Sequence, residues 1–256
     1  MLWTPTPDYR IYPDKGYISV TSYTDKWPKG ERFEDYLLDN TREQAAKKLR
    51  EAGERGTRVH EVIEYILNGT KYTLEDYVKN FFSYDPERGY REWKKYVEPF
   101  YHWYTDFGFP APIATEIRCH SDHLKTAGTI DTIFNISGRL AIIDWKTSAD
   151  IHMGHKIQQA VYWHCAEDDG SIKIENCGLV RLGAQFKTVK ELKSLDDRHT
   201  GIGYEYVPVT QAERPGLIKK FKVCQEIFHE EHGDDAATIE PVELMDFIQI
   251  SNPIKK

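Results

Sequence analysis

The sequence predicts an α/β fold in which helices flank a mixed central sheet and an N-terminal helical extension precedes it. Apolar residues recur at helical spacing before residue 110. Three consecutive strand-like segments then occupy residues 113–147, and later strand-like segments alternate with helical ones. With 256 residues and 40% hydrophobic content, the chain can bury a full core. We expect residues 1–110 to form an irregular segment and a helical region, residues 111–256 to form the sheet-containing core, and both to belong to one compact domain.

Residues 1–40 are rich in Pro, Tyr and turn-forming residues. This composition predicts an irregular N-terminal segment with one short strand at residues 17–21. Between residues 41 and 68 the apolar residues take up helical spacing, which the stretch from Gly53 to Gly56 interrupts. We therefore predict two helices there, joined by a tight turn.

An aromatic stripe marks the next helical segment, residues 87–109. Its rings recur at alternating steps of three and four, which places them on one helical face. They are Trp93, Tyr96, Phe100, Trp103 and Phe107. Spacing this regular favours packing in the core, and Pro99 should kink or restart the helix.

Three strand-like segments follow, at residues 113–120, 126–136 and 140–147, and a Ser-Gly turn separates the last two. We predict an antiparallel meander. The rest of the chain predicts a helix, two strands and a final helix. These elements span residues 152–167, 177–182, 204–209 and 211–231, respectively.

Bulk properties exclude some classes of protein. The net charge of −7 argues against coating nucleic acid by charge alone, although acids clustered around a divalent cation are compatible with an enzyme that acts on it. No run approaches the roughly 20 apolar residues that span a bilayer, and the first ten residues lack a signal-peptide layout. We expect a cytoplasmic protein with no membrane association. The four cysteines form no CxxC pair, which predicts reduced thiols.

The most informative chemistry lies at the end of the meander. Residues two apart on a strand face the same side, so Asp144 and Lys146 should lie about 7 Å apart on one face. An apolar run, residues 141–143, precedes them and predicts a buried strand. Asp131 lies on the neighbouring strand, and two adjacent carboxylates repel unless a cation separates them. Oxygen ligands favour Mg²⁺ or Mn²⁺, which makes a phosphodiester substrate plausible.

Three short motifs resemble those of the RecB-type branch of the PD-(D/E)XK nuclease superfamily. They are Gly128-x-x-Asp131, Asp144-x-Lys146-Thr147 and Gln158-x-x-x-Tyr162. Upstream, Gly56-Thr57-x-x-His60 with Glu64 resembles the histidine motif of that branch, so the resemblance spans residues 56–162. Together with Ser19-Val20-Thr21, this layout looks more like phage exonucleases and the mitochondrial genome maintenance exonuclease than like restriction enzymes.

The resemblance implies a restriction-endonuclease-like fold and a role for each motif residue. It implies metal ligation by Asp131 and Asp144, with His60 and Glu116 as additional ligands of Mg²⁺ or Mn²⁺. Lys146 would be the catalytic lysine, and Gln158 and Tyr162 would form a supporting pair on one helix face. Several relatives carry a four-cysteine iron-sulfur cluster, but only Cys224 lies near the C-terminal end here. We therefore predict no cluster.

The resemblance favours a metal-dependent DNA exonuclease that hydrolyses phosphodiester bonds on single strands or DNA ends. It would serve replication, recombination or repair, with proteins of those processes as candidate partners, in a bacterium or as a phage-encoded protein. The alternatives are a structure-selective or restriction-like endonuclease and a non-catalytic nucleic-acid-binding protein. Tyr101 and Tyr104, off the aromatic stripe, are candidates for base stacking. His152 and His155 are interpreted as solvated histidines at a helix start.

Overall fold

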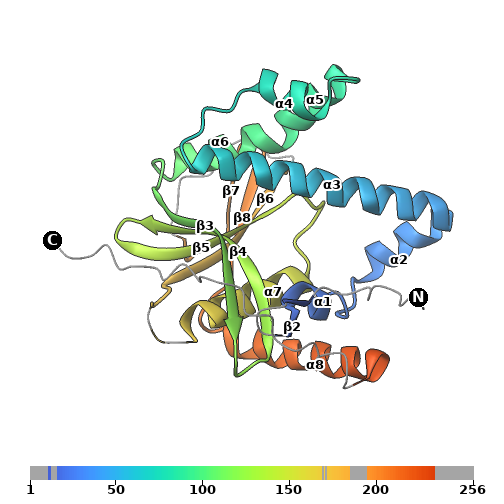
Figure 1. Cartoon of the computed structure of the whole chain (residues 1–256), viewed down its shortest axis with the longest axis vertical. Coiled ribbons are helices and arrows are strands. Elements are labelled where there is room, and N and C mark those ends of the chain that lie inside the picture. The colour runs from blue at the N-terminus through green and yellow to red at the C-terminus, as the bar shows by residue number, and fades with distance from the viewer. Residues whose placement is uncertain (1–10, 13–15, 169, 171, 185–194, 234–256) are drawn as a thin grey trace, which may run out of the picture.

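Eight strands form one mixed sheet in the computed structural model, which describes residues 11–12, 16–168, 170, 172–184 and 195–233 (Figure 1). The strand order is β1-β2-β4-β5-β6-β8-β7, and β3 pairs with β4. The strands are β1 (Ile11–Tyr12), β2 (Tyr17–Ser19), β3 (Pro112–Ser121), β4 (Thr126–Ile136), β5 (Arg139–Lys146), β6 (Asn176–Leu182), β7 (His199–Gly201) and β8 (Tyr204–Pro208). Helices flank this sheet, which confirms the predicted α/β fold class.

The described helices surround the sheet in chain order. They are α1 (Val20–Thr24), α2 (Glu31–Leu38), α3 (Arg42–Leu67), α4 (Leu74–Phe81), α5 (Pro86–Glu92), the π-helix η1 (Trp93–Val97), α6 (Glu98–Asp106), α7 (Met153–Glu167) and α8 (Arg214–His232). None of these combines the length and apolar character needed to cross a bilayer.

Two apolar cores lie on opposite faces of the sheet. α1, α7 and α8 cover one face, where Ile142 of β5 packs with Val161 of α7. α3 and α6 cover the other, where Ile143 and Trp145 pack with Phe100 (Figure 1). Successive side chains of a strand point to opposite faces of the sheet. Because β5 is buried on both faces, its central residues form a continuous apolar run in the sequence.

The antiparallel meander of β3, β4 and β5 is confirmed, and it leaves a gap beside β4. β3 pairs along one edge of β4. On the other edge, β2 pairs with the first two residues of β4, and β5 pairs with it from Thr132 onward. Because a strand has only two edges, residues 128–131 lie between β2 and β5. Gly128 and Asp131 are the two ends of this gap.

The predicted break near residue 53 is wrong, because α3 is one helix of 26 residues. Thr41 and Gln44 form a reciprocal capping box at its start. Gly53 and Gly56 stay helical, although each glycine costs about 1 kcal/mol relative to alanine. Residues beyond them, such as Ile63, bury apolar surface against the sheet. That tertiary packing outweighs the local propensity.

The aromatic stripe is confirmed as core. Its first four rings are buried. Trp93 belongs to a third apolar cluster with Tyr77 of α4, and Tyr96, Phe100 and Trp103 belong to the core between α6 and the sheet, against which Phe107 packs partly buried. Tyr101 and Tyr104, the stacking candidates, are also partly buried there. Pro99 is the second residue of α6, directly after the π-helix η1, so the regular α-helix restarts at Pro99 as predicted. Proline lacks an N–H donor, and its ring crowds the preceding turn of a regular α-helix. The wider π turn before Pro99 relieves this crowding.

Most later elements lie where the pattern predicted them, including α7, β6, β8 and α8. Residues 16–40 contain more regular structure than predicted, because α1 and α2 follow the short strand β2. That strand stops at Ser19, whose hydroxyl accepts a hydrogen bond from the Ser22 N–H and so caps α1. The short elements α4 and β7 were not predicted.

Candidate active site

Asp131 lies at the point where β5 separates from β4. Thr132 pairs with Ile143, so Asp131 and Asp144 are the next residues along the two strands. There the Asp131 carboxylate replaces a backbone partner, because its Oδ2 accepts a hydrogen bond from the Trp145 N–H at 2.9 Å. This bond holds the Asp131 carboxylate at the mouth of the gap between β2 and β5.

His60 reaches the same carboxylate from α3. Its Nε2 lies 2.8 Å from the carbonyl oxygen of Trp145, and its Nδ1 lies 3.3 Å from Asp131 Oδ2. A carbonyl oxygen only accepts, so Nε2 must carry the proton. In the neutral ring, Nδ1 then presents its lone pair toward Asp131. A backbone hydrogen bond that sets the tautomer in this way is typical of a metal-binding histidine.

Glu116 completes a group of three possible metal ligands. One donor atom each from His60, Glu116 and Asp131 lies within 4.8 Å of the others. Pairing between β3 and β4 passes from Thr115 to Ile117, and Glu116, which has a left-handed φ of 48°, is skipped in this pairing although β3 continues through it. Such a backbone costs a non-glycine residue about 1–3 kcal/mol and is commonest at functional sites.

The charge state of Glu116 fits a cation site. Its side chain remains exposed at the rim, yet partial burial raises the pKa of Glu116 to about 7, and the neighbouring Asp131 carboxylate adds to this. A divalent ion between the carboxylates would remove this repulsion. Two carboxylates and an imidazole also suit such an ion chemically.

Asp144 and Lys146 form a buried ion pair beside this group. Asp144 is 2% exposed, and Lys146 Nζ lies 2.8 Å from its Oδ2. The same ammonium donates to Asp144 Oδ1 at 3.1 Å and to Gln158 Oε1 at 3.2 Å. Burial raises the pKa of Asp144, and Lys146 opposes that shift. The Asp144 carboxylate lies outside the group of three donors, so its ligand role stays a prediction.

Gln158 and Tyr162 lie one turn apart on α7 and extend this network. Gln158 Nε2 donates to the Tyr162 hydroxyl oxygen at 3.1 Å, while its Oε1 accepts from Lys146. The ring of Tyr162 packs directly on Gly128, where a Cβ atom would lie 2.4 Å from Tyr162 Cε1. Position 128 of the Gly128-x-x-Asp131 motif therefore requires glycine for a steric reason, because any side chain there would displace the Tyr162 ring.

Sequence reasoning misjudged one residue beside Lys146, His155. A hollow of about 740 Å³ opens beside Lys146 and Gln158, and His155 lines it. The interpretation of His155 as a solvated histidine is wrong: burial lowers the pKa of His155 to about 2, and its Nδ1 is buried without a hydrogen-bond partner among the described residues. The i, i+3 spacing of His152, His155 and Gln158 could have indicated that these residues share one face of α7, the face toward Lys146.

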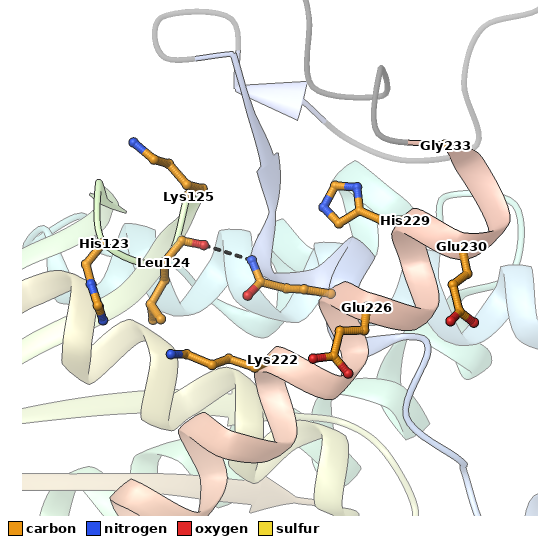
Figure 2. Close-up of a pocket in the computed structure, with 9 residues that line it drawn as sticks. His123, Leu124, Lys125, Lys222, Glu226, His229, Glu230 and Gly233 are labelled. Atoms are coloured by element: carbon orange, nitrogen blue, oxygen red, sulfur yellow. Dashed lines mark hydrogen bonds between the residues drawn. The ribbon is translucent and has the colours of Figure 1, made fainter.

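A second hollow, of about 750 Å³, lies elsewhere, between α8 and the turn that joins β3 to β4 (Figure 2). Lys125 and Lys222 face it together with Glu226 and Glu230. The amide of Gln225 donates to the Leu124 carbonyl oxygen at 2.8 Å beside it. None of the predicted site residues lines this hollow.

The sequence also carries basic stretches that could grip phosphate. Lys187, Lys190 and Lys193 lie outside the described residues. Arg181 and Arg198 both pair with Glu205, so this one carboxylate compensates part of their charge within the fold.

Comparison with known proteins agrees with this geometry. A family model described as the PD-(D/E)XK nuclease superfamily matches residues 33–241, most of the chain and all of the site residues above. A search of curated proteins finds no significant match. The chain therefore belongs to the PD-(D/E)XK nuclease superfamily.

Proposed function

We propose that this protein is a metal-dependent deoxyribonuclease, and specifically an exonuclease that hydrolyses phosphodiester bonds at DNA ends or on single strands. The observation that carries this proposal is the convergence of His60, Glu116 and Asp131 donors within 4.8 Å, beside the Asp144–Lys146 pair. Superfamily membership supports nuclease chemistry at this position. The placement of His60 on a preceding helix supports the RecB-type branch.

Mg²⁺ or Mn²⁺ is the proposed cofactor. His60, Glu116, Asp131 and Asp144 would hold it, since carboxylate oxygens favour hard cations. When bound, such an ion polarises a phosphoryl oxygen and lowers the pKa of a bound water.

Lys146 is the proposed catalytic cation. The Asp144 carboxylate and the Gln158 amide oxygen fix its ammonium from two directions. A cation held in this way can orient an attacking water and stabilise negative charge that develops on the phosphate. Tyr162 acts through Gln158, which makes Tyr162 a positioning residue.

Cleavage of labelled DNA tests the site. Purified protein is incubated with end-labelled single- and double-stranded DNA in Mg²⁺, Mn²⁺ or EDTA. We expect metal-dependent cleavage that is lost in Asp131→Asn and Lys146→Ala and retained in Lys47→Ala, a matched change at an exposed lysine of α3. Cleavage that survives the two site substitutions unchanged would refute the assignment.

Covalently closed circular DNA separates the two catalytic modes. An exonuclease leaves it intact and degrades it only after linearisation, whereas a restriction-like endonuclease cuts the closed circle. The proposed setting is replication, recombination or repair in the bacterial cytoplasm or during phage growth. Binding of DNA without cleavage in any metal would favour the non-catalytic alternative.

A further inference from the structure

A groove leads away from the lysine of the site, and we call it the α2–α3 groove. It is the hollow of about 740 Å³ lined by residues of α1, α2, α3 and α7, with Lys146 and Gln158 among its walls. A volume of this size suits a bound ligand. Because it borders the proposed catalytic lysine directly, whatever occupies it lies against the site.

Aromatic rings line this groove. Trp27, Phe33 and Tyr36 all contribute to its wall, and each remains partly exposed. Phe33 and Tyr36 stack on each other along α2, with ring centroids 6.0 Å apart and planes inclined by 29°. Rings at a surface offer flat faces on which nucleobases can stack. Paired bases in a duplex already stack on their neighbours, so this contact favours an unpaired strand.

Lysine ammonium groups lie beside two of these aromatic rings. Lys29 Nζ lies 5.2 Å from the Phe33 ring centroid, and Lys48 Nζ lies 5.8 Å from that of Tyr36. Among the described residues that line the groove, Lys29, Lys48 and Arg55 are cationic besides Lys146, whose charge Asp144 compensates, and Asp25 alone is acidic. Asp25 lies 3.5 Å from Lys29 on an exposed surface, where such pairs are weak. In a chain of net charge −7, this is a local concentration of positive charge.

Arg55 joins the groove to a smaller hollow. The second one, of about 410 Å³, shares Arg55, Ser148 and Ala149 with the groove and adds Lys95 and Arg181. Arg55 packs over the Tyr96 ring at 5.0 Å and donates to the Thr147 carbonyl oxygen. Arg181 is paired with Glu205, so Arg55 and Lys95 are the cations that extend the positive charge to the other side of the loop that follows β5.

The hollow beside α8 differs in these respects. Its lining holds two lysines and two glutamates, and its described lining includes none of the tryptophan, tyrosine or phenylalanine rings found in the groove (Figure 2). Mixed charge attracts phosphate poorly. Rings together with an excess of cations distinguish the α2–α3 groove.

We propose that the α2–α3 groove binds a stretch of unpaired DNA, with its bases stacked on Phe33, Tyr36 and Trp27 and its phosphates paired with Lys29, Lys48 and Arg55. This inference rests on the proposed function, because the groove would hold the strand that Lys146 acts on. It narrows the proposed substrate to single-stranded DNA and names the residues that select it.

Equilibrium binding tests the groove separately from cleavage. Fluorescence anisotropy of a labelled thymidine oligonucleotide is measured with the full chain in EDTA at several salt concentrations. In Phe33→Leu/Tyr36→Leu we expect affinity to fall about tenfold or more. In Lys29→Ala/Lys48→Ala we expect the slope of log affinity against log salt to drop by about 1.4, or about 0.7 for each lost phosphate contact.

Matched controls are Tyr84→Leu, at an exposed ring on the turn before α5, and Lys47→Ala, at an exposed lysine of α3 that does not line the groove. Both should bind the oligonucleotide within twofold of the wild type. Circular dichroism and thermal unfolding confirm that each variant is folded. Ring and lysine variants that are folded yet bind normally would overturn the proposal, as would an equal loss of affinity for blunt duplex DNA.

The two proposals fail in distinguishable ways. If the wild type cleaves DNA but the groove variants bind and cleave like the wild type, the proposed DNA-binding role of the groove is wrong and the proposed nuclease activity is supported. If the wild type binds single strands through these residues but cleaves nothing in any metal, the groove stands and the proposed function fails.

Discussion

Glu116 is the residue whose ionisation should control metal binding. A protonated carboxyl is a poor ligand, and burial raises the pKa of Glu116 to about 7. We expect Mn²⁺ affinity, measured by titration calorimetry, to fall as the pH drops below 7, approaching about tenfold per pH unit for one displaced proton. Glu116→Gln should bind more weakly and lose most of this pH dependence. Equal pH profiles in the two proteins would contradict the prediction.

The same residue should affect the stability of the metal-free protein. The pKa of Glu116 rises from 4.5 to about 7 on folding, so the folded state holds more protons than the unfolded state between these values. Its contribution to stability is therefore lost as the pH rises through that window. Thermal unfolding in EDTA should show a smaller decline for Glu116→Gln than for the wild type. A decline of the same size would place the responsible group elsewhere.

Lys146 has a structural role besides its proposed catalytic one. Its ammonium compensates Asp144, which is almost fully buried. We expect Lys146→Met to lower the free energy of unfolding by about 3 kcal/mol, because a buried charge loses its partner. Cleavage should fall about a hundredfold or more.

The double variant Lys146→Met/Asp144→Asn separates these two effects. It removes both charges, so it should regain much of the lost stability in denaturant unfolding while remaining inactive. A single variant as stable as the wild type would show that Asp144 is neutral in the fold.

At the scale of elements, the contact between β4 and α7 depends on Gly128. Gly128→Ala would place a Cβ atom 2.4 Å from Tyr162 Cε1 and force the ring to move. We expect a loss of about 1–3 kcal/mol in denaturant unfolding. Cleavage should fall as well, because Tyr162 supports Gln158, which contacts Lys146.

Gly53→Ala is the matched control within α3. Nothing lies within 4 Å of its Cβ position, and the residue is helical. The same substitution should therefore stabilise the protein, by up to about 1 kcal/mol. If both glycine variants lost stability equally, the steric account of Gly128 would be wrong.

At the scale of the whole molecule, we propose that residues 1–110 and 111–256 form one cooperative domain. α3 and α6 share an apolar core with the sheet, and His60 of α3 contacts Asp131 of β4. We expect the near- and far-ultraviolet circular dichroism signals to change together on heating. Separate transitions would show that the two parts fold independently.

Metal should stabilise this whole unit. A ligand that binds only the folded state stabilises it by about 2.7 kcal/mol when the free ligand concentration is a hundred times the dissociation constant. Mn²⁺ should therefore raise the unfolding temperature of the wild type, and should do so much less in Asp131→Asn. Equal shifts in both would mean that the ion binds elsewhere.

The sequence alone determined the elements whose signals are local. The meander follows from alternation around a Ser-Gly turn, and the buried run before Asp144 marked β5. The aromatic stripe predicted a buried face because a regular helix repeats its surface every turn. The motif residues indicate a nuclease of this superfamily without any knowledge of the tertiary structure.

Tertiary structure alone decided what depends on contacts between distant segments. α3 continues through two glycines because its second half packs on the sheet, and propensity carries no information about that burial. The left-handed backbone of Glu116 and the hydrogen bond that sets the His60 tautomer arise from neighbours far along the chain. The α2–α3 groove exists only where four helices meet. A one-dimensional pattern records which face of an element is apolar, whereas the partner of that face is set by the free energy of the whole packed molecule.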